Sequence, residues 1–370
     1  MASNQKPSQD PVWEDYFEPI GAGIEPISGA VKEYDGGEHR RAPIVRVAVL
    51  GGVARWVGSL GSFRFWATAL GMLCATWAGA AGLVILAGQG GDATAWLAPP
   101  VLTYLLACSL LPGAAAVAAT HWGMSAYRLP MPGGRAGVRI LGAAVTAGLQ
   151  GLVLALLILV TLLVEAGAAR QPGAVAAVSA FVAAGEGFVF GGMGAAVAAI
   201  GRTPVLKRIV GWALALFLVA GTVAAGAALA PATRSDEPVT VALNVKHAPD
   251  GISVSYQCSS VAAGLREVYH TDRIMWLPAA SPSVLFVMLA GQSYGNEGLL
   301  GWLSGTLQEA ADGTAVPCVN GEPRSGDALG MPVAAVGLLL QAGIAAGLIG
   351  WAHALSGRRA EPAPPDGAAS

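Results

Sequence analysis

Six long apolar runs constrain this chain more than any other feature of its sequence. A helix needs about 20 apolar residues to cross the roughly 30 Å hydrocarbon layer of a bilayer. Runs of that length cover residues 65–87, 99–120, 140–164, 174–200, 209–230 and 332–355. They are uniformly apolar and do not alternate, so they favour helices over the strands of a membrane barrel. The sequence therefore predicts an all-α polytopic membrane protein with six transmembrane helices.

The composition agrees with a chain whose main partner is the lipid bilayer. Of the 370 residues, 54% are hydrophobic and 12% are charged, and the mean hydropathy is +0.57. A soluble domain carries roughly a quarter charged residues, so the composition argues against a water-soluble globule. The formal net charge is -2, so no overall basic field indicates a nucleic-acid partner.

Lys and Arg gather on alternate connections between the apolar runs, which predicts the orientation of the chain. They are Lys32, Arg40, Arg41, Arg46, Arg55 and Arg64 before the first run, Arg128, Arg135 and Arg139 after the second, Arg202, Lys207 and Arg208 after the fourth, and Arg358 and Arg359 after the sixth. The connection at residues 88–97 has none, and the connection after the third run has Glu165 and Arg170. We expect a multi-pass protein of the plasma membrane with both termini in the cytoplasm and residues 231–331 outside.

The segments around the runs divide the rest of the chain. Residues 1–43 are expected to form a polar cytoplasmic tail, and residues 356–370, rich in Pro and Ala, a disordered tail. Residues 44–64 carry apolar side chains at helical spacing with Arg46 and Arg55 among them, which predicts an amphipathic helix in the cytoplasmic interface. The alternative is that they simply begin the first span. Residues 65–230 then form a five-helix bundle, and residues 332–355 the sixth span.

Residues 231–331 form the expected extracytoplasmic segment. Alternating apolar residues within 239–257, around a Pro-Asp-Gly turn at 249–251, predict a β-hairpin. Cys258 and Cys318 share an oxidising side of the membrane, so we expect a disulfide between them. The apolar stretches 283–290 and 298–307 are too short to span. They predict either a re-entrant pair of helices or the buried helices of a small external domain.

Glu186 is the acidic residue placed well inside an apolar run. A charge at that depth costs about 3 kcal/mol on insertion scales, so the side chain should face the bundle or a wet cavity. Two interpretations remain open. Glu186 is either a polar point on a substrate path or a protonated or paired residue that fixes helix packing.

Sequence motifs of enzymes and metal sites are missing from the chain. It contains no GxxxxGK[ST] or HExxH, and its Cys and His residues lack metal-ligand spacing. One GxSxG pattern, GQSYG at residues 291–295, stands between two apolar stretches and lacks the strand-to-helix context of a nucleophile elbow. The sequence therefore predicts no enzyme activity, no metal site and no cofactor in this chain.

A short stretch before the last run resembles a known family. Residues 270–277, HTDRIMWL, are followed by Ser281, Pro282 and an apolar run. This pattern resembles the segment before the last span in actinobacterial permease subunits of ABC exporters, where an Arg and a Trp precede an Asn-Pro pair. Here Ser281 stands at the Asn position. The layout of residues 44–355 resembles the same family, while the long polar N-terminus is not part of its pattern.

The resemblance implies a permease that forms the substrate path as a homo- or heterodimer. ATP would bind to a separate ABC ATPase subunit, docked on residues 121–139 and 201–208 and on the interfacial helix. Glu186 would lie on the path, and an outer gate would include Trp276, Pro282, Tyr294 and Asn296. The alternative, from another class, is a membrane-anchored sensor or scaffold protein with a disulfide-closed extracytoplasmic domain. An intramembrane enzyme is the weakest reading, because no catalytic pair is visible.

Overall fold

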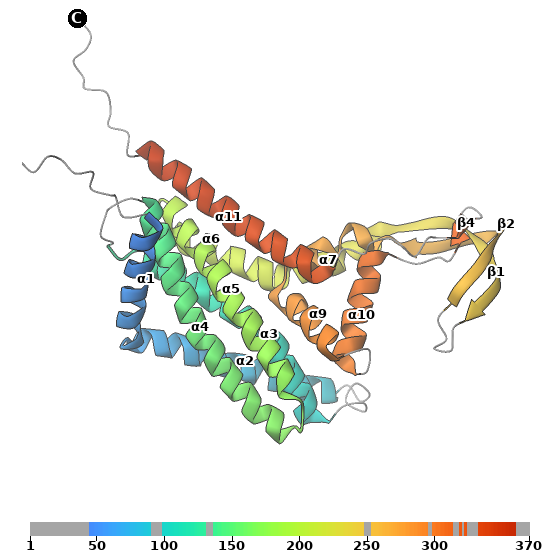
Figure 1. Ribbon diagram of the computed structural model, residues 1–370, viewed down its shortest axis with the longest axis horizontal. Helices are drawn as coiled ribbons and strands as arrows, with labels where there is room; N and C mark the ends of the chain where they lie inside the picture. The colour runs from blue at the N-terminus through green and yellow to red at the C-terminus, as the bar shows by residue number, and fades with distance from the viewer. Residues whose placement is uncertain are drawn as a thin grey trace, which may run out of the picture. The chain divides into compact units, whose positions relative to one another are not determined.

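The structure is a computed structural model, shown in Figure 1. It describes residues 44–89, 98–130, 136–247, 253–294, 298–313, 318–319, 322–323 and 332–359. The two predicted tails, the predicted hairpin turn at 249–251 and Asn296 lie outside these residues.

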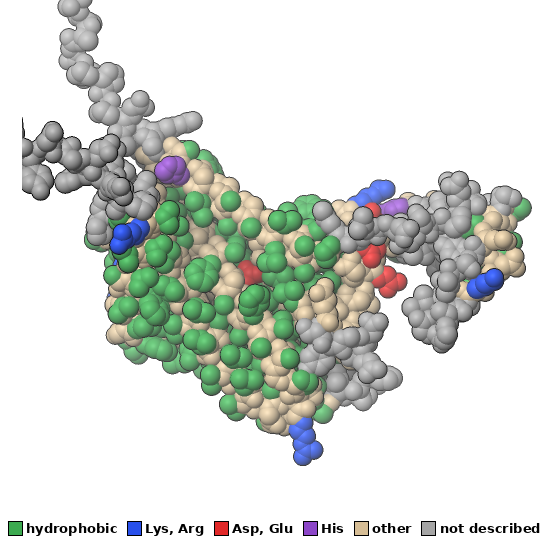
Figure 2. Space-filling view, viewed as in Figure 1, with side chains coloured by type: hydrophobic (Ala, Val, Ile, Leu, Met, Phe, Trp, Pro, Cys, Tyr) green, Lys and Arg blue, Asp and Glu red, His purple; other side chains and the backbone are tan. Residues whose placement is uncertain are grey.

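Among the residues that the structure describes, six helical segments are long and apolar enough to cross a membrane, which confirms the six predicted spans. They are α2 (Phe63–Gln89), α3 (Pro99–Tyr127), α4 (Ala136–Ala168), α5 (Gly173–Ile200), the segment Pro204–Thr233 and α11 (Val333–Arg359). Hydrophobic side chains cover the helices on the face shown in Figure 2. The chain is therefore a multi-pass helical membrane protein.

Helices α3, α4 and α5 pack against one another and form the centre of the bundle (Figure 1). Small residues allow their backbones to approach closely. A Cβ atom added to Gly194 on α5 would lie 2.3 Å from the Thr120 carbonyl oxygen on α3, and one added to Gly151 on α4 would lie 2.7 Å from the Gly187 Cα on α5. Close approach is the main source of helix association in lipid, where no hydrophobic drive exists between helices.

Helix α1 (Ile44–Leu60) is separate from the first span, because Gly61 and Ser62 interrupt the helix before α2 begins at Phe63. It packs on α4 at Gly52, where an added Cβ would lie 2.9 Å from the Gly142 carbonyl oxygen. Its apolar residues Val45 and Leu50 are both 60% exposed and face away from the protein. The position of α1 in the cytoplasmic interface stays a prediction.

The fifth span is not a continuous α-helix. It consists of α6 (Pro204–Leu216), a π-helical turn η1 (Phe217–Gly221), α7 (Thr222–Leu229) and a 3-10 turn η2 (Ala230–Thr233). The Thr203 side chain caps the start of α6 by accepting a hydrogen bond from the Leu206 backbone N–H at 3.2 Å. Single π-turns inside α-helices are rare and often occur at functional sites.

The segment after the fifth span contains strands as well as helices. Its strands β1 (Arg234–His247), β2 (Ser253–Tyr269), β3 (Cys318–Val319) and β4 (Glu322–Pro323) form one sheet in the order β2-β1-β3-β4. Antiparallel β1 and β2 confirm the predicted hairpin. The all-α description therefore holds for the membrane bundle alone, while the protein as a whole is mostly helical. The side of the membrane on which the sheet lies stays a prediction.

Short helices follow the hairpin before the last span begins. They are the 3-10 turn η3 (Thr271–Arg273), α8 (Trp276–Ala279), α9 (Pro282–Tyr294) and α10 (Leu299–Asp312). Helix α9 contacts the spans α3, α5 and α11 as well as α10. Its residues Leu285, Phe286 and Met288 are at most 3% exposed. The structure thus packs α9 against spanning helices, and whether α9 and α10 are re-entrant stays a prediction.

Candidate functional site: a buried polar cluster at the α8–α9 turn

The turn between α8 and α9 brings the segment that follows the fifth span into the bundle. Its backbone hydrogen bonds run from Ala280 N to Leu277 O at 3.1 Å and from Ser281 N to Pro278 O at 2.9 Å. Pro282 then begins α9, at a position where its missing N–H costs no helical hydrogen bond. Gly337 on α11 makes room for this turn, because a Cβ there would lie 2.1 Å from the Ala279 carbonyl oxygen.

Ser281 ties the turn to the interrupted fifth span. Its side chain is fully buried, and its Oγ donates a hydrogen bond to the Val219 carbonyl oxygen at 2.8 Å. Val219 lies inside η1, near the middle of the span Pro204–Thr233. A π-turn disturbs the ordinary hydrogen-bond pattern of a helix, and the Ser281 hydroxyl supplies a donor at that point. The α8–α9 turn therefore reaches the middle of a membrane span.

Gln341 ties the same turn to the last span. Its side chain is 1% exposed, and Nε2 donates a hydrogen bond to the Ala280 carbonyl oxygen at 3.0 Å. The amide of Gln341 also approaches the Glu186 carboxyl group on α5. We call Glu186, Val219, Ala280, Ser281 and Gln341 the turn cluster.

Glu186 is 2% exposed and lies near the middle of α5. Within the described part of the chain, neither of its carboxyl oxygens has a well-formed hydrogen bond, and the same is true of Gln341 Oε1. The Gln341 amide retains a second N–H and a free oxygen, so it can donate to a carboxylate or accept from a carboxylic acid. The cluster can therefore serve either protonation state of Glu186, or offer unused hydrogen bonds to a polar ligand.

The residues expected at an outer gate do not come together at one point. Pro282 is buried beside the turn cluster as the first residue of α9. Trp276 is 51% exposed, and its Nε1 donates to the Arg273 carbonyl oxygen at 2.9 Å. Tyr294 is the last residue of α9, and Asn296 lies outside the described residues. The gate stays a prediction.

Cys258 and Cys318 form a disulfide, which confirms the predicted pair. Their Cα atoms lie 5.6 Å apart, and 60 positions separate them in the sequence. The bond joins β2 to β3, and it therefore links the hairpin covalently to the strand that follows α10.

Three members of the turn cluster, Val219, Ala280 and Gln341, were not predicted from the sequence. Gln341 is a polar residue inside the sixth apolar run, and that signal alone could have marked it. Ser281 was noticed only for its place in the resemblance. Val219 has no sequence signal, because it takes part in the cluster through its backbone carbonyl oxygen.

The described residues contain no group of His, Cys, Asp and Glu that could hold a metal ion. Comparisons of the chain with protein-family models, with curated proteins and with solved structures find no match in any of the three.

Proposed function

We propose that the chain is the permease subunit of an ATP-driven exporter of the plasma membrane. In this proposal the chain forms the substrate path as a dimer, both termini are cytoplasmic, and a separate ABC ATPase subunit binds ATP. The observation that carries the transport proposal is the turn cluster, in which a short non-spanning helix meets a buried carboxyl group at mid-span depth.

Membrane anchoring alone does not call for such a cluster. Polar groups in the hydrocarbon region are costly, and irregular backbone there occurs where it is buried in protein or lines a wet cavity. Helix α9 depends on Ser281 and Gln341 for two of its attachments to the spans. Small changes in these two contacts would move α9 relative to α5. A gate requires a movable element of this kind.

The ATPase subunit is proposed to dock where α1 meets the end of α3. Arg55 Nη1 on α1 donates to the Ala126 carbonyl oxygen at 3.2 Å. Arg139 Nη2 on α4 donates to the Tyr127 carbonyl oxygen at 3.0 Å, and its guanidinium lies 4.7 Å from the centre of the Tyr127 ring. These contacts link α1, α3 and α4 at one end of the bundle. A movement of α1 caused by the ATPase subunit would therefore be passed to α3 and, through α3, to α5.

The test is purification of the tagged full-length chain from membranes of its own host in mild detergent. We expect an ATPase subunit with a P-loop to co-purify. We also expect a strain from which the gene is deleted to lose efflux of a drug or lipid. Reintroduction of the gene should restore that efflux. Purification without any ATPase, together with unchanged efflux in the deletion strain, would refute the proposal.

A Glu186→Gln variant tests the role of the turn cluster in transport. Gln is neutral and of similar size, so we expect normal expression but at least tenfold slower efflux, because the carboxyl group is lost. Glu165→Gln, at the end of α4, is the matched control and should transport normally. Normal efflux by Glu186→Gln would remove Glu186 from the path.

A second candidate function is a sensor or scaffold anchored by the bundle. The hairpin favours it, because Val241, Leu243 and Leu265 on β1 and β2 are 49%, 49% and 74% exposed. Exposed apolar side chains on a disulfide-closed sheet suit contact with another protein. If efflux is unaffected by Glu186→Gln but a cellular response is lost on Leu265→Ser, this second function replaces the first.

A further inference from the structure

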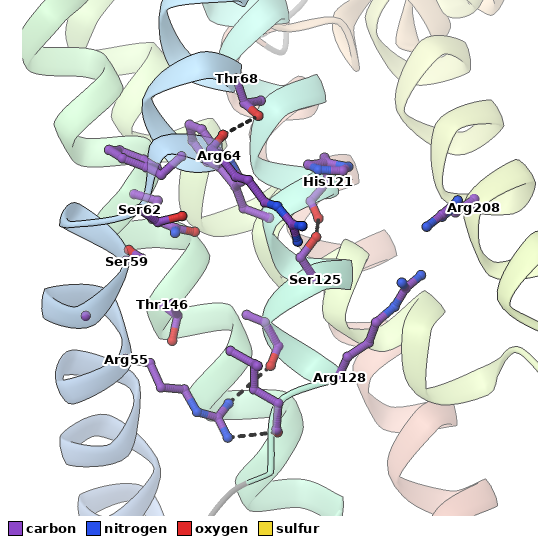
Figure 3. A pocket seen from close by; sticks show the side chains of 16 residues that line it. Arg55, Ser59, Ser62, Arg64, Thr68, His121, Ser125, Arg128, Thr146 and Arg208 are labelled. Atoms are coloured by element: carbon purple, nitrogen blue, oxygen red, sulfur yellow. Dashed lines mark hydrogen bonds between the residues drawn. The ribbon is translucent and has the colours of Figure 1, made fainter. Parts of the chain in front are cut away.

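A basic cavity lies where α1, α2, α3, α4 and α6 meet, and no residue of the turn cluster lines it (Figure 3). Its volume is about 700 Å³. Four of its lining residues are arginines, namely Arg55, Arg64, Arg128 and Arg208, and His121 adds a fifth basic group. Among the residues that the structure describes, no Asp or Glu lines this cavity.

Arg55 has a structural task in the wall of the cavity. Besides the Ala126 carbonyl, it donates to the Leu129 carbonyl oxygen at 2.9 Å and to the Pro130 carbonyl oxygen. Burial and the like charge of Arg139 lower the pKa of Arg55. The guanidinium therefore fixes the end of α3 to α1, and the contacts it uses are backbone carbonyls rather than a carboxylate.

The other three arginines stand without such contacts. Within the described residues, no hydrogen bond or ion pair joins the side chain of Arg64, Arg128 or Arg208 to another group; the ion pairs found there are Arg234–Glu267 and His270–Asp272. Figure 3 shows Arg64 reaching toward His121, and Arg128 and Arg208 extending toward each other. Like charges held this way repel one another unless an anion lies between them.

Buried polar atoms in the same wall also lack partners. Trp122 is 5% exposed, and its Nε1–H has no hydrogen-bond acceptor among the described residues. Gln150 is 7% exposed, and its Oε1 has no donor there. Leaving a buried polar atom unpaired costs about 1–3 kcal/mol, so these two side chains make this part of the bundle more polar than an apolar helix contact.

We propose that this cavity binds a phosphate group, a monoester or diester, through Arg64, Arg128 and Arg208. A guanidinium group binds two phosphate oxygens at once through two parallel N–H groups. This bidentate geometry makes Arg better suited to phosphate than other side chains.

The three arginines lie at matching ends of their spans: near the start of α2, at the C-cap of α3 and near the start of α6. That level corresponds to lipid headgroups, where basic pockets between spans hold anionic lipids. The phosphate can come from a headgroup or from a free solute. The proposal does not depend on the transport function.

The experiment measures binding to the detergent-purified full-length protein with three separate probes: phosphatidic acid, phosphatidylcholine and inorganic phosphate. The variant replaces Arg64, Arg128 and Arg208 by Gln and keeps Arg55. Arg202→Gln, an exposed arginine beside α6 that does not line the cavity, is the matched control. Thermal unfolding confirms that each variant is folded, and the single Arg64→Gln variant is used if the triple variant is not.

We expect saturable binding of phosphatidic acid, or of inorganic phosphate, that is at least a hundredfold weaker in the triple variant and unchanged in Arg202→Gln. Arg64→Gln alone should weaken it about tenfold. Preference for phosphatidic acid over the other two probes identifies a lipid headgroup, and binding of inorganic phosphate identifies a free solute.

The proposal fails if no probe saturates, or if the triple variant binds as tightly as the wild type. It also fails if the arginine variants leave the binding of every probe unchanged and alter only the protease sensitivity of residues 1–43. The arginines would then bind that acidic segment instead of a phosphate group.

Discussion

At the scale of single residues, the bundle depends on a few polar side chains that lipid makes expensive. Glu186 was identifiable from the sequence because an acid inside an apolar run has few explanations. Its neighbour Gln341 completes the site, because its amide approaches the Glu186 carboxyl group and donates to the Ala280 carbonyl oxygen. Each of these residues would be costly in contact with lipid, and both are buried inside the bundle.

Gln341→Leu should destabilise the protein by about 1–3 kcal/mol, because it leaves the buried Ala280 carbonyl without its donor. The measurement is thermal unfolding of the purified variant in detergent. Ser356→Ala on the same helix serves as the control, since that hydroxyl bonds only to the Ala352 carbonyl one turn away. Equal unfolding midpoints for Gln341→Leu and the wild type would show that the bond contributes nothing.

Ser281→Ala removes the hydroxyl that donates to the Val219 carbonyl in η1. We expect a loss of about 1–2 kcal/mol of stability, together with faster hydrogen exchange of backbone amides in η1 and α9 than in α5. Hydrogen-exchange mass spectrometry separates these segments. A uniform change across the whole bundle would contradict the local role given to Ser281.

At the scale of elements, glycine positions decide which helices touch. Gly194 faces the Thr120 carbonyl at the crossing of α3 and α5, whereas Gly185 on the same helix has nothing within 4 Å of an added Cβ. The two glycines look alike in the sequence. Packing alone makes one of them necessary and the other replaceable.

Gly194→Ala should therefore lower stability by about 1–3 kcal/mol, because a backbone carbonyl cannot move aside for the new methyl group. Gly185→Ala should be neutral or stabilising by up to about 1 kcal/mol, since Ala favours helix more than Gly. Thermal unfolding and the yield of folded protein compare the pair directly. If both variants behave alike, the close crossing of α3 and α5 is wrong.

At the scale of the whole molecule, charge orientation and the disulfide describe the same topology. The alternation of Lys and Arg predicts that residues 231–331 face outward, and the bonded pair Cys258–Cys318 lies within them. A disulfide persists in an oxidising compartment and is rare in the cytosol. The predicted orientation places the bond in such an oxidising compartment, and the orientation itself stays a prediction.

Thiol labelling tests the bond and the orientation together. In the non-reduced protein, Cys258 and Cys318 should resist a maleimide, while the exposed thiol of Cys74 reacts in detergent and buried Cys108 reacts only on unfolding. After reduction of whole cells with a membrane-impermeant reagent, both outer cysteines should become labelled from outside. Labelling only after cell lysis would reverse the orientation.

The six spans and the hairpin were predictable from the sequence because each depends on local properties, whereas the disulfide was predicted from the expected compartment of its two cysteines. A run of apolar residues is long enough to cross a bilayer whatever it packs against. Two cysteines in one oxidising compartment form a disulfide when the fold brings them together. The turn cluster and the basic cavity were decided by tertiary structure. They join residues as distant as Glu186 and Gln341, or Arg64 and Arg208. Which faces of the helices meet depends on side-chain packing across the bundle, and single apolar runs carry too little periodic signal to specify it.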